Sequence, residues 1–265
     1  MIKINRGPEP KELIDLRNTH LHRIRQLGRE PTSKEIYGYE AIGKILWTAQ
    51  HHKCCYCEQK ITKDYNDVEH YRPKTTADRS PGCMLKHGYW WLAYTWENLL
   101  FACPSCNRSN KKSLFPLDSG SISLHAETSP PDREIPLLID PTSINPIEHI
   151  QFIYKNNSWW AQPRNGSLLG NKSIDVYGLN SSDLIELRQD YYEMTLTPQI
   201  NALDQAIDHD NIKILSYEFK RTLAMLNPRN PYVGFSYDVL TSKINNLKKI
   251  TGLLKEKWPS PNQIT

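Results

Sequence analysis

Two pairs of cysteines have a spacing that predicts metal binding. Cys54 and Cys57 form one C-x2-C motif, and Cys103 and Cys106 form a second motif after 45 intervening residues. Each tight turn of this type can direct two thiolates toward one ion, and four thiolates make the tetrahedral site typical of structural zinc. The interval exceeds the ~15 to 20 residues of a plain zinc ribbon, so a sizeable segment must be inserted between the two turns. We therefore expect one structural Zn²⁺ held by Cys54, Cys57, Cys103 and Cys106.

Other potential ligands lie close to the first motif. Cys55, His51 and His52 are near enough in sequence to replace one of the four cysteines. Coordination by both complete motifs remains the simpler hypothesis, and the alternative without metal is four unconnected core cysteines. Cys83 lies apart from both motifs, and we expect a free thiol there.

A second group of polar residues lies between the motifs and directly after them. Glu69 and His70 are adjacent in VEHYRPK, Asn98 lies in WENLL, and Asn107 follows the last cysteine of the second motif. Imidazole is suited to act as a general base near neutral pH, and carboxylate and amide oxygens suit Mg²⁺ or Mn²⁺. Together these residue types could activate water and neutralise charge on a phosphodiester. Each of them taken alone would carry little weight.

Basic residues bracket this group on both sides. The first 120 residues contain 19 Lys and Arg against 13 Asp and Glu, whereas the rest of the chain has a slight excess of acids. Because Lys and Arg supply much of the affinity for nucleic acid, we expect phosphate contacts in the first half, with solvated surface charge as the alternative. The candidates are Arg72, Lys74, Arg108, Lys111 and Lys112.

The order of these parts, CYC, EH, ENL and CPSCN followed by basic residues, resembles the HNH endonuclease family over residues 54–112. This resemblance implies two short strands and a helix that clamp one divalent cation. It also implies that His70 is the general base, that Asn98 fixes the loop holding the histidine, and that Asn107 gives its amide oxygen to the catalytic metal. Glu69 stands where the family usually has Asp, and its extra methylene leaves open whether it binds the catalytic metal directly.

A longer pattern extends the resemblance to nearly the whole chain. With LFPL, LLIDPTSINPIEHIQF and IDVYGLN included, the sequence resembles the PtuB family, the HNH effectors of Septu anti-phage systems that also occur with retrons. The resemblance implies an antiviral nuclease controlled by a partner ATPase of the ABC/SMC-like class, PtuA. In a retron system, a reverse transcriptase and its RNA–DNA product would be further partners.

The expected function is thus metal-dependent hydrolysis of nucleic acid, with DNA favoured. Two alternatives remain open. One is a nuclease with the same site that acts on a structured host RNA, and the other is a zinc-dependent nucleic-acid adaptor without catalysis. No residue plainly reads a 2′-hydroxyl or a base edge, so the sequence does not choose between DNA and RNA.

We expect these residues to be positioned by an α+β fold. It would consist of a zinc-stabilised ββα-metal nuclease module followed by a largely α-helical region. Helical periodicity is expected over residues 200–207, 212–226 and 237–258, and a strand at 149–154 belongs to a small hairpin. The expected segments are an N-terminal strand and helical segment (1–50), the nuclease module (51–117), a connector with the hairpin (118–170) and the α-helical region (171–265).

Composition limits the class of protein. The chain has 265 residues, of which 38% are hydrophobic and 23% charged, as in a soluble globular protein and unlike a collagen or a disulfide-rich scaffold. The longest apolar stretch, residues 89–94, is far shorter than the ~20 residues needed to cross a bilayer. Since the first ten residues also lack a signal-peptide pattern, we expect a cytoplasmic location. We interpret the aromatic residues of this stretch as core rather than as a platform for stacking bases.

Overall fold

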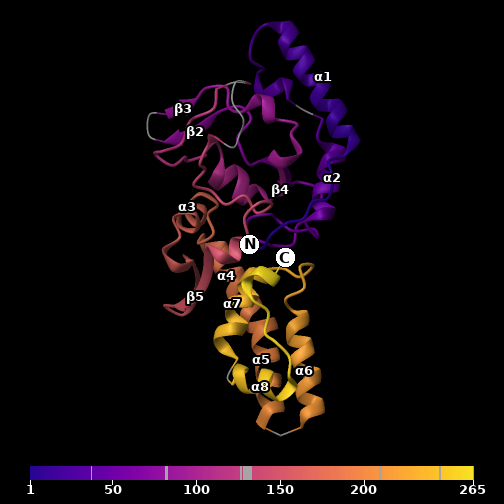
Figure 1. Ribbon diagram of the computed structural model, residues 1–265, viewed down its shortest axis with the longest axis vertical. Coiled ribbons are helices and arrows are strands. Elements are labelled where there is room, and N and C mark those ends of the chain that lie inside the picture. The colour runs from indigo at the N-terminus through magenta and orange to yellow at the C-terminus, as the bar shows by residue number, and fades with distance from the viewer. Residues whose placement is uncertain are drawn as a thin grey trace.

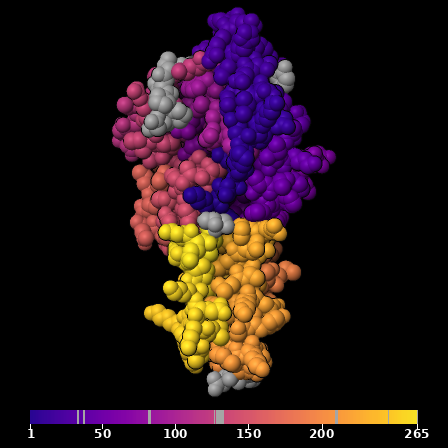
Figure 2. All heavy atoms as spheres, turned by 45° about the vertical axis from the view of Figure 1, so that its right-hand side comes forward, coloured from indigo at the N-terminus to yellow at the C-terminus, as the bar shows by residue number. Residues whose placement is uncertain are grey.

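The computed structural model describes residues 1–36, 38–80, 83–125, 127, 133–208, 211–244 and 246–264. Helices and small two-stranded sheets are combined in a mixed fold. The first half of the chain, with α1 and α2, occupies one end of an elongated molecule, and the C-terminal helices occupy the other (Figure 1). A space-filling view shows the same two parts meeting at the middle of the long axis (Figure 2).

A two-stranded sheet and a short helix lie at the centre of the first part. Strand β1 (Asp67–His70) pairs antiparallel with β4 (Leu99–Ala102), so that Asp67 lies opposite Ala102 and His70 opposite Leu99. All four residues of β4, LLFA, are buried, as expected for a strand covered on both faces. A π-helix, Ser105–Lys111, begins three residues after the strand. The strand pair and the helix thus form one compact unit in the order strand, strand, helix.

Helix α2 (Glu40–Ala49) packs against both strands of this sheet. Its Gly43 faces the sheet, and a Cβ atom there would make ordinary van der Waals contacts, 3.4 Å from the Val68 side chain and 3.7 Å from that of Phe101. Helix α1 (Lys11–Leu27) precedes it and packs on α2. Residues 1–5 form no regular strand; the Ile4 N–H donates to the Pro141 carbonyl instead (2.8 Å).

The aromatic run before β4 is buried. Two 3-10 turns, Trp90–Leu92 and Trp96–Asn98, carry it into the core of the first part. Each of its large side chains is at most 9% exposed: Tyr89, Trp90, Trp91, Leu92, Tyr94 and Trp96. The interpretation of this run as core is therefore confirmed, since its rings are not free to stack on bases.

Two further hairpins complete the sheets. Strand β2 (Ala77–Ser80) pairs with β3 (Cys83–Leu85), and β5 (Ile150–Lys155) pairs with β6 (Ser158–Pro163). The second hairpin turns through Asn156 and Asn157, whose φ angles are 51° and 59°. Asn adopts the left-handed conformation more readily than most residues and suits a two-residue hairpin turn of this kind.

Six α-helices follow the second hairpin in the described part of the chain. They are α3 (Leu168–Val176), α4 (Ser182–Tyr191), α5 (Thr197–Asp208), α6 (Ile212–Ala224), α7 (Val233–Lys243) and α8 (Leu247–Leu254). A π turn, Tyr192–Leu196, joins α4 to α5, whose second residue is Pro198, which cannot donate a backbone hydrogen bond. None of the helices that the structure describes is both long enough and apolar enough to span a bilayer.

The expectation of one helix over residues 237–258 was wrong. Helix α7 ends at Lys243, Ile244 leaves helical geometry with ψ 108°, and Asn246 has φ 60° before α8 begins. The apolar stripe continues across this break, because Ile244 and Ile250 are both buried. Periodicity alone could not reveal the break, since each helix buries its own portion of the stripe.

A buried carboxylate connects the two parts of the molecule. Glu58, directly after the first cysteine motif, accepts hydrogen bonds from the N–H groups of Val233 (3.2 Å) and Gly234 (2.9 Å) at the start of α7. It also pairs with two buried cations, the N-terminal ammonium of Met1 at 3.0 Å and the Lys53 ammonium at 3.3 Å. A carboxylate at a helix N-terminus satisfies free N–H groups and complements the helix dipole.

Two glycines offer a matched test of packing near the loop at residues 73–75. Gly88 and Gly28 both have positive φ, but a Cβ on Gly88 would lie 2.5 Å from the Pro73 carbonyl, whereas one on Gly28 would meet nothing within 4 Å. We expect Gly28→Ala to cost about 1–2 kcal/mol from backbone strain alone. Gly88→Ala should cost about 1–3 kcal/mol more, because the loop must also move. Urea denaturation of both variants measures the difference, and equal losses would contradict this packing.

Candidate zinc site and active site

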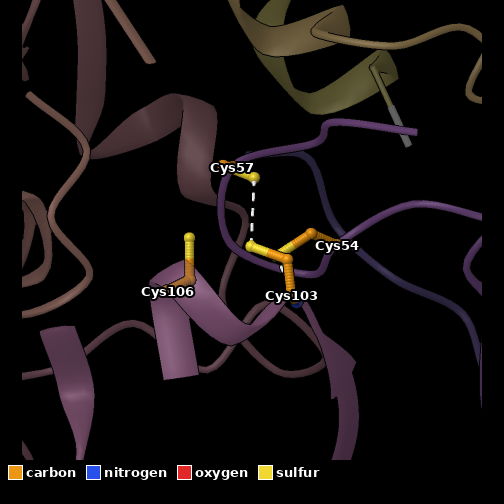
Figure 3. Close-up of side chains that lie close together, drawn as sticks. All are labelled: Cys54, Cys57, Cys103 and Cys106. Carbon is orange, nitrogen blue, oxygen red and sulfur yellow. Dashed lines mark hydrogen bonds between the residues drawn. The ribbon is translucent and has the colours of Figure 1, made fainter. Parts of the chain in front are cut away.

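The two cysteine motifs meet at one point. Cys54 and Cys57 lie on the loop after α2, while Cys103 and Cys106 lie at the junction of β4 with the π-helix (Figure 3). All four are buried, and their sulfur atoms lie within 4.8 Å of one another, with 3.9 Å between those of Cys57 and Cys103. Tetrahedral bonds of about 2.3 Å to Zn²⁺ require sulfurs roughly 3.8 Å apart. The four thiols therefore form a group that can hold a zinc ion.

The neighbouring residues stay outside this group. Cys55 is buried, and burial raises the pKa of its thiol well above the ordinary value, which favours the neutral form. His52 stacks on Trp47 with ring centres 3.7 Å apart. Among the described residues, neither His51 nor His52 belongs to the converging set, and Cys83 lies on β3, only partly buried.

A pocket of about 290 Å³ lies beside β1 and the π-helix. Three of the four predicted catalytic residues line it: Glu69, His70 and Asn107. The fourth, Asn98, is buried behind it, 4% exposed. Four charged residues also line the pocket: Asp67, Lys74, Arg108 and Lys112.

His70 is held with one ring nitrogen turned into the protein. Its Nε2 lies 3.0 Å from the Ala93 carbonyl oxygen and 3.0 Å from the Tyr39 hydroxyl. A carbonyl oxygen only accepts hydrogen bonds, so this contact assigns the proton to Nε2 and leaves the lone pair on Nδ1. Burial, followed by the charge of Lys74, lowers the pKa of His70 well below its ordinary value. The imidazole is thus neutral at neutral pH, with its lone pair on Nδ1.

Asn98 fixes the chain directly after the histidine. Its Oδ1 accepts a hydrogen bond from the Arg72 N–H (2.7 Å), and its Nδ2 donates to the carbonyls of Arg72 (3.0 Å) and Leu92 (3.2 Å). The Tyr71 N–H in turn donates to the Asn98 carbonyl (2.9 Å). These four bonds hold the end of β1 against the aromatic core.

Glu69 faces the π-helix. Its Oε1 lies 2.7 Å from the Lys111 ammonium and accepts a hydrogen bond from the Tyr56 hydroxyl at 3.2 Å. The Lys111 ammonium also donates to the His70 carbonyl oxygen (2.9 Å). Burial raises the pKa of the Glu69 carboxyl, and the Lys111 charge opposes that shift.

Asn107 is oriented by a carboxylate that the sequence analysis did not single out. The Asn107 amide nitrogen donates to Asp67 (3.1 Å), and the Arg108 guanidinium also contacts this carboxylate, with Nε 2.8 Å from Oδ2. Asp67 lies two residues before Glu69 on a strand, and side chains at that spacing share a face. Alternation along the strand was the signal that could have identified it.

The five predicted phosphate contacts fall into two groups. Lys74, Arg108 and Lys112 line the pocket. Lys74 also lies over the Tyr39 ring, and burial lowers its pKa to about 8. Arg72 and Lys111 instead make internal ion pairs, Arg72 with the buried Glu134 (3.0 Å) and Lys111 with Glu69.

The donor chemistry of the pocket fits a small divalent cation. Carboxylate and amide oxygens are the ligands that Mg²⁺ and Mn²⁺ prefer, and Glu69 and Asn107 bring one of each to the pocket that His70 also lines. Among the described residues, however, the cysteine cluster is the one group of three or more His, Cys, Asp or Glu side chains whose ligand atoms lie close enough to share a metal ion. A hard cation would thus find two oxygen ligands here and keep several waters.

Fold and site together define a mixed helix and small-sheet protein whose four buried cysteines can hold zinc. Among known proteins, the chain is similar to the Septu protein PtuB of Bacillus mycoides (strain KBAB4), with 27% identity over 96% of this chain and 95% of that protein. It is 24% identical to the PtuB of Bacillus thuringiensis over 93% of this chain and 83% of that protein. The chain is thus related to PtuB along nearly its full length, which confirms that part of the resemblance.

A third relative bears a different name. The Septu protein PtuA of Bacillus mycoides (strain KBAB4) is 28% identical over 168 residues, which are 63% of this chain and only 23% of PtuA. No protein-family model matches the chain, and no solved structure matches it.

Removing one cysteine of the cluster should release zinc. We expect Cys103→Ala to lose about one equivalent of zinc and to unfold the first part of the chain, because metal binding supplies folding free energy to such sites. Cys83→Ala should keep both zinc and fold, since this thiol lies outside the cluster. Elemental analysis and circular dichroism measure both effects. A folded Cys103→Ala protein with one zinc equivalent would shift the assignment to His51, His52 or Cys55.

Proposed function

We propose that this protein is a metal-dependent HNH endonuclease that hydrolyses phosphodiester bonds of nucleic acid. The observation that carries the proposal is the pocket that brings His70, Glu69 and Asn107 together from β1 and the π-helix. The histidine carries its lone pair on Nδ1, and the other two residues offer oxygen ligands. This combination suits hydrolysis of a phosphodiester better than a purely structural zinc module.

In the proposed reaction, Nδ1 of His70 takes a proton from a water molecule that attacks phosphorus. The Ala93 carbonyl holds Nε2–H, so the imidazole keeps its tautomer and orientation while the proton moves. Asn98 keeps the strand end in place. Mg²⁺ or Mn²⁺, when held by Glu69 and Asn107, would supply positive charge to the non-bridging oxygens and to the leaving 3′-oxygen.

The cysteine cluster has a separate, structural role in this proposal. A zinc ion bound by four thiolates has no open coordination position, so it stabilises the fold and does not activate water. Lys74, Arg108 and Lys112 are the proposed phosphate contacts at the pocket. Three of the five candidate phosphate contacts form ion pairs: Arg72, Arg108 and Lys111. Arg108 is the most accessible of these three, because its side chain remains 65% exposed beside Asp67.

The relatives support the proposal of a role in Septu anti-phage defence. We propose DNA as the favoured substrate. Two relatives are named Septu protein PtuB, and a segment similar to this chain also occurs within a longer protein named PtuA. Segments of partner proteins that occur in one polypeptide often act together, so we propose an ATPase of the PtuA type as the partner that controls cleavage. A retron reverse transcriptase with its RNA–DNA product is a further proposed partner in systems that contain one.

Substituting the proposed base tests catalysis. Plasmid DNA incubated with Mg²⁺ or Mn²⁺ should be cleaved by the wild type and about 10²–10⁴-fold more slowly by His70→Ala, the usual contribution of a general base. The control His22→Ala changes an exposed histidine and should cleave normally. Zinc content should be equal in all three proteins.

Equal cleavage by wild type and His70→Ala would reject the catalytic assignment and favour an adaptor that binds nucleic acid without chemistry. Because a partner could restrain the nuclease, the same comparison is made with the PtuA-type ATPase and ATP present. If the wild type cleaves nucleic acid neither alone nor with the ATPase, the catalytic assignment is also rejected.

Matched DNA and RNA substrates test the nature of the target. We expect faster cleavage of DNA, because the proposed contacts of Lys74, Arg108 and Lys112 are with phosphates and do not require a 2′-hydroxyl. Single-turnover rates on two substrates of the same sequence measure the preference. Faster cleavage of RNA that depends on His70 would make a structured RNA the physiological target.

A further inference from the structure

The proposed metal ligand Glu69 already contacts a cation of the chain itself. Lys111 Nζ lies 2.7 Å from Glu69 Oε1, and the two side chains are 1% and 4% exposed. Solvent therefore screens this pair very little, and its attraction is much stronger than that of a surface ion pair. Lys111 also has little freedom, because its ammonium donates to the His70 carbonyl as well.

The unusual helix geometry accounts for the position of this lysine. Ser105–Lys111 is a π-helix, and its last turn is closed by an i→i+5 hydrogen bond from the Lys112 N–H to the Asn107 carbonyl (2.7 Å). The chain leaves the helix at Lys112 with a positive φ of 50°. Consequently two successive lysines separate, with Lys111 fully buried against β1 and Lys112 exposed at the pocket. Short π segments within helices often mark functional sites.

Among the described residues, two side chains contact the Glu69 carboxylate, and both contact the same oxygen. The Tyr56 hydroxyl donates to Oε1 from 3.2 Å, and Lys111 approaches this oxygen too. Glu69 lines the pocket, whereas Lys111 and Tyr56 do not belong to its lining. The two side chains thus contact the carboxylate from outside the pocket, and neither of them contacts Oε2.

We propose that Lys111 and Tyr56 are positioning residues of the metal site, which hold Glu69 so that Oε2 faces the pocket, and that Lys111 is not a phosphate contact. The inference rests on the proposed function, because it assumes that Glu69 binds the catalytic metal. Carboxylate ligands depend on such outer hydrogen bonds, whose loss typically costs ~10- to 100-fold in metal affinity. The proposal replaces the earlier interpretation of Lys111 as part of a nucleic-acid surface.

Binding of Mn²⁺ to the zinc-loaded full-length protein tests this role without measuring catalysis. Free Mn²⁺ is followed by electron paramagnetic resonance for the wild type, Lys111→Met and the adjacent control Lys112→Met. We expect Lys111→Met to weaken Mn²⁺ binding at least about 10-fold and Lys112→Met to weaken it by less than about 3-fold. Equal or tighter binding by Lys111→Met would overturn the proposal, and so would equal losses in the two variants.

Tyr56→Phe keeps Lys111 and removes only one hydroxyl, so it serves as the test if Lys111→Met does not fold. A several-fold loss of Mn²⁺ affinity is expected, and an unchanged affinity would overturn the proposal. Zinc content and thermal unfolding identify properly folded variants. If the wild type itself binds no Mn²⁺, the proposed catalytic metal site fails, and this inference fails with it.

A second readout separates positioning from phosphate contact. Binding of a DNA duplex without added divalent metal should be unchanged within about 2-fold in Lys111→Met, because a buried lysine cannot neutralise a phosphate. A loss of DNA affinity as large as that in Lys112→Met would place Lys111 among the phosphate contacts and overturn the proposal.

Discussion

The close approach of four buried cysteine sulfurs is the constraint on which the rest of the site depends. Sulfur atoms within 4.8 Å of one another cannot all ionise unless a cation neutralises them, and zinc is the cation that this ligand set prefers. Cys103 follows β4 directly, and Cys106 lies in the first turn of the π-helix. Bound zinc would therefore fix the angle between strand and helix, and with it the distance from Asn107 to β1.

Successive side chains of β1 point to opposite faces, so that two different parts of the fold hold the residues of the site. Asp67 and Glu69 share the face that meets the π-helix, where they contact Asn107 and Lys111 respectively. His70 points the other way along the strand, toward the Ala93 carbonyl in the aromatic core. The base and the oxygen ligands are thus held by separate parts of the fold. A change in the helix could alter the metal ligands while the histidine stays in place.

The sequence was informative where chemistry depends on local spacing. Both cysteine motifs and the adjacent Glu69 and His70 are visible as short patterns, and the structure brings their side chains to two neighbouring sites. Sequence patterns did not show which lysines and arginines would be buried, because ion pairing depends on tertiary contacts. Lys111 faces Glu69 only because a π-helix follows the second motif, and Arg72 meets Glu134 from a segment 62 residues away. The break between α7 and α8 was missed for a similar reason, since the apolar stripe continues through it.

Anomalous X-ray diffraction from crystals containing zinc and Mn²⁺ tests the two-metal account most directly. The account predicts a zinc peak about 2.3 Å from each of the four cysteine sulfurs and a separate manganese peak about 2.2 Å from oxygens of Glu69 and Asn107. His70 Nδ1 should face a water molecule near the manganese. A manganese peak elsewhere, or none beside these two residues at saturating Mn²⁺, would contradict the account.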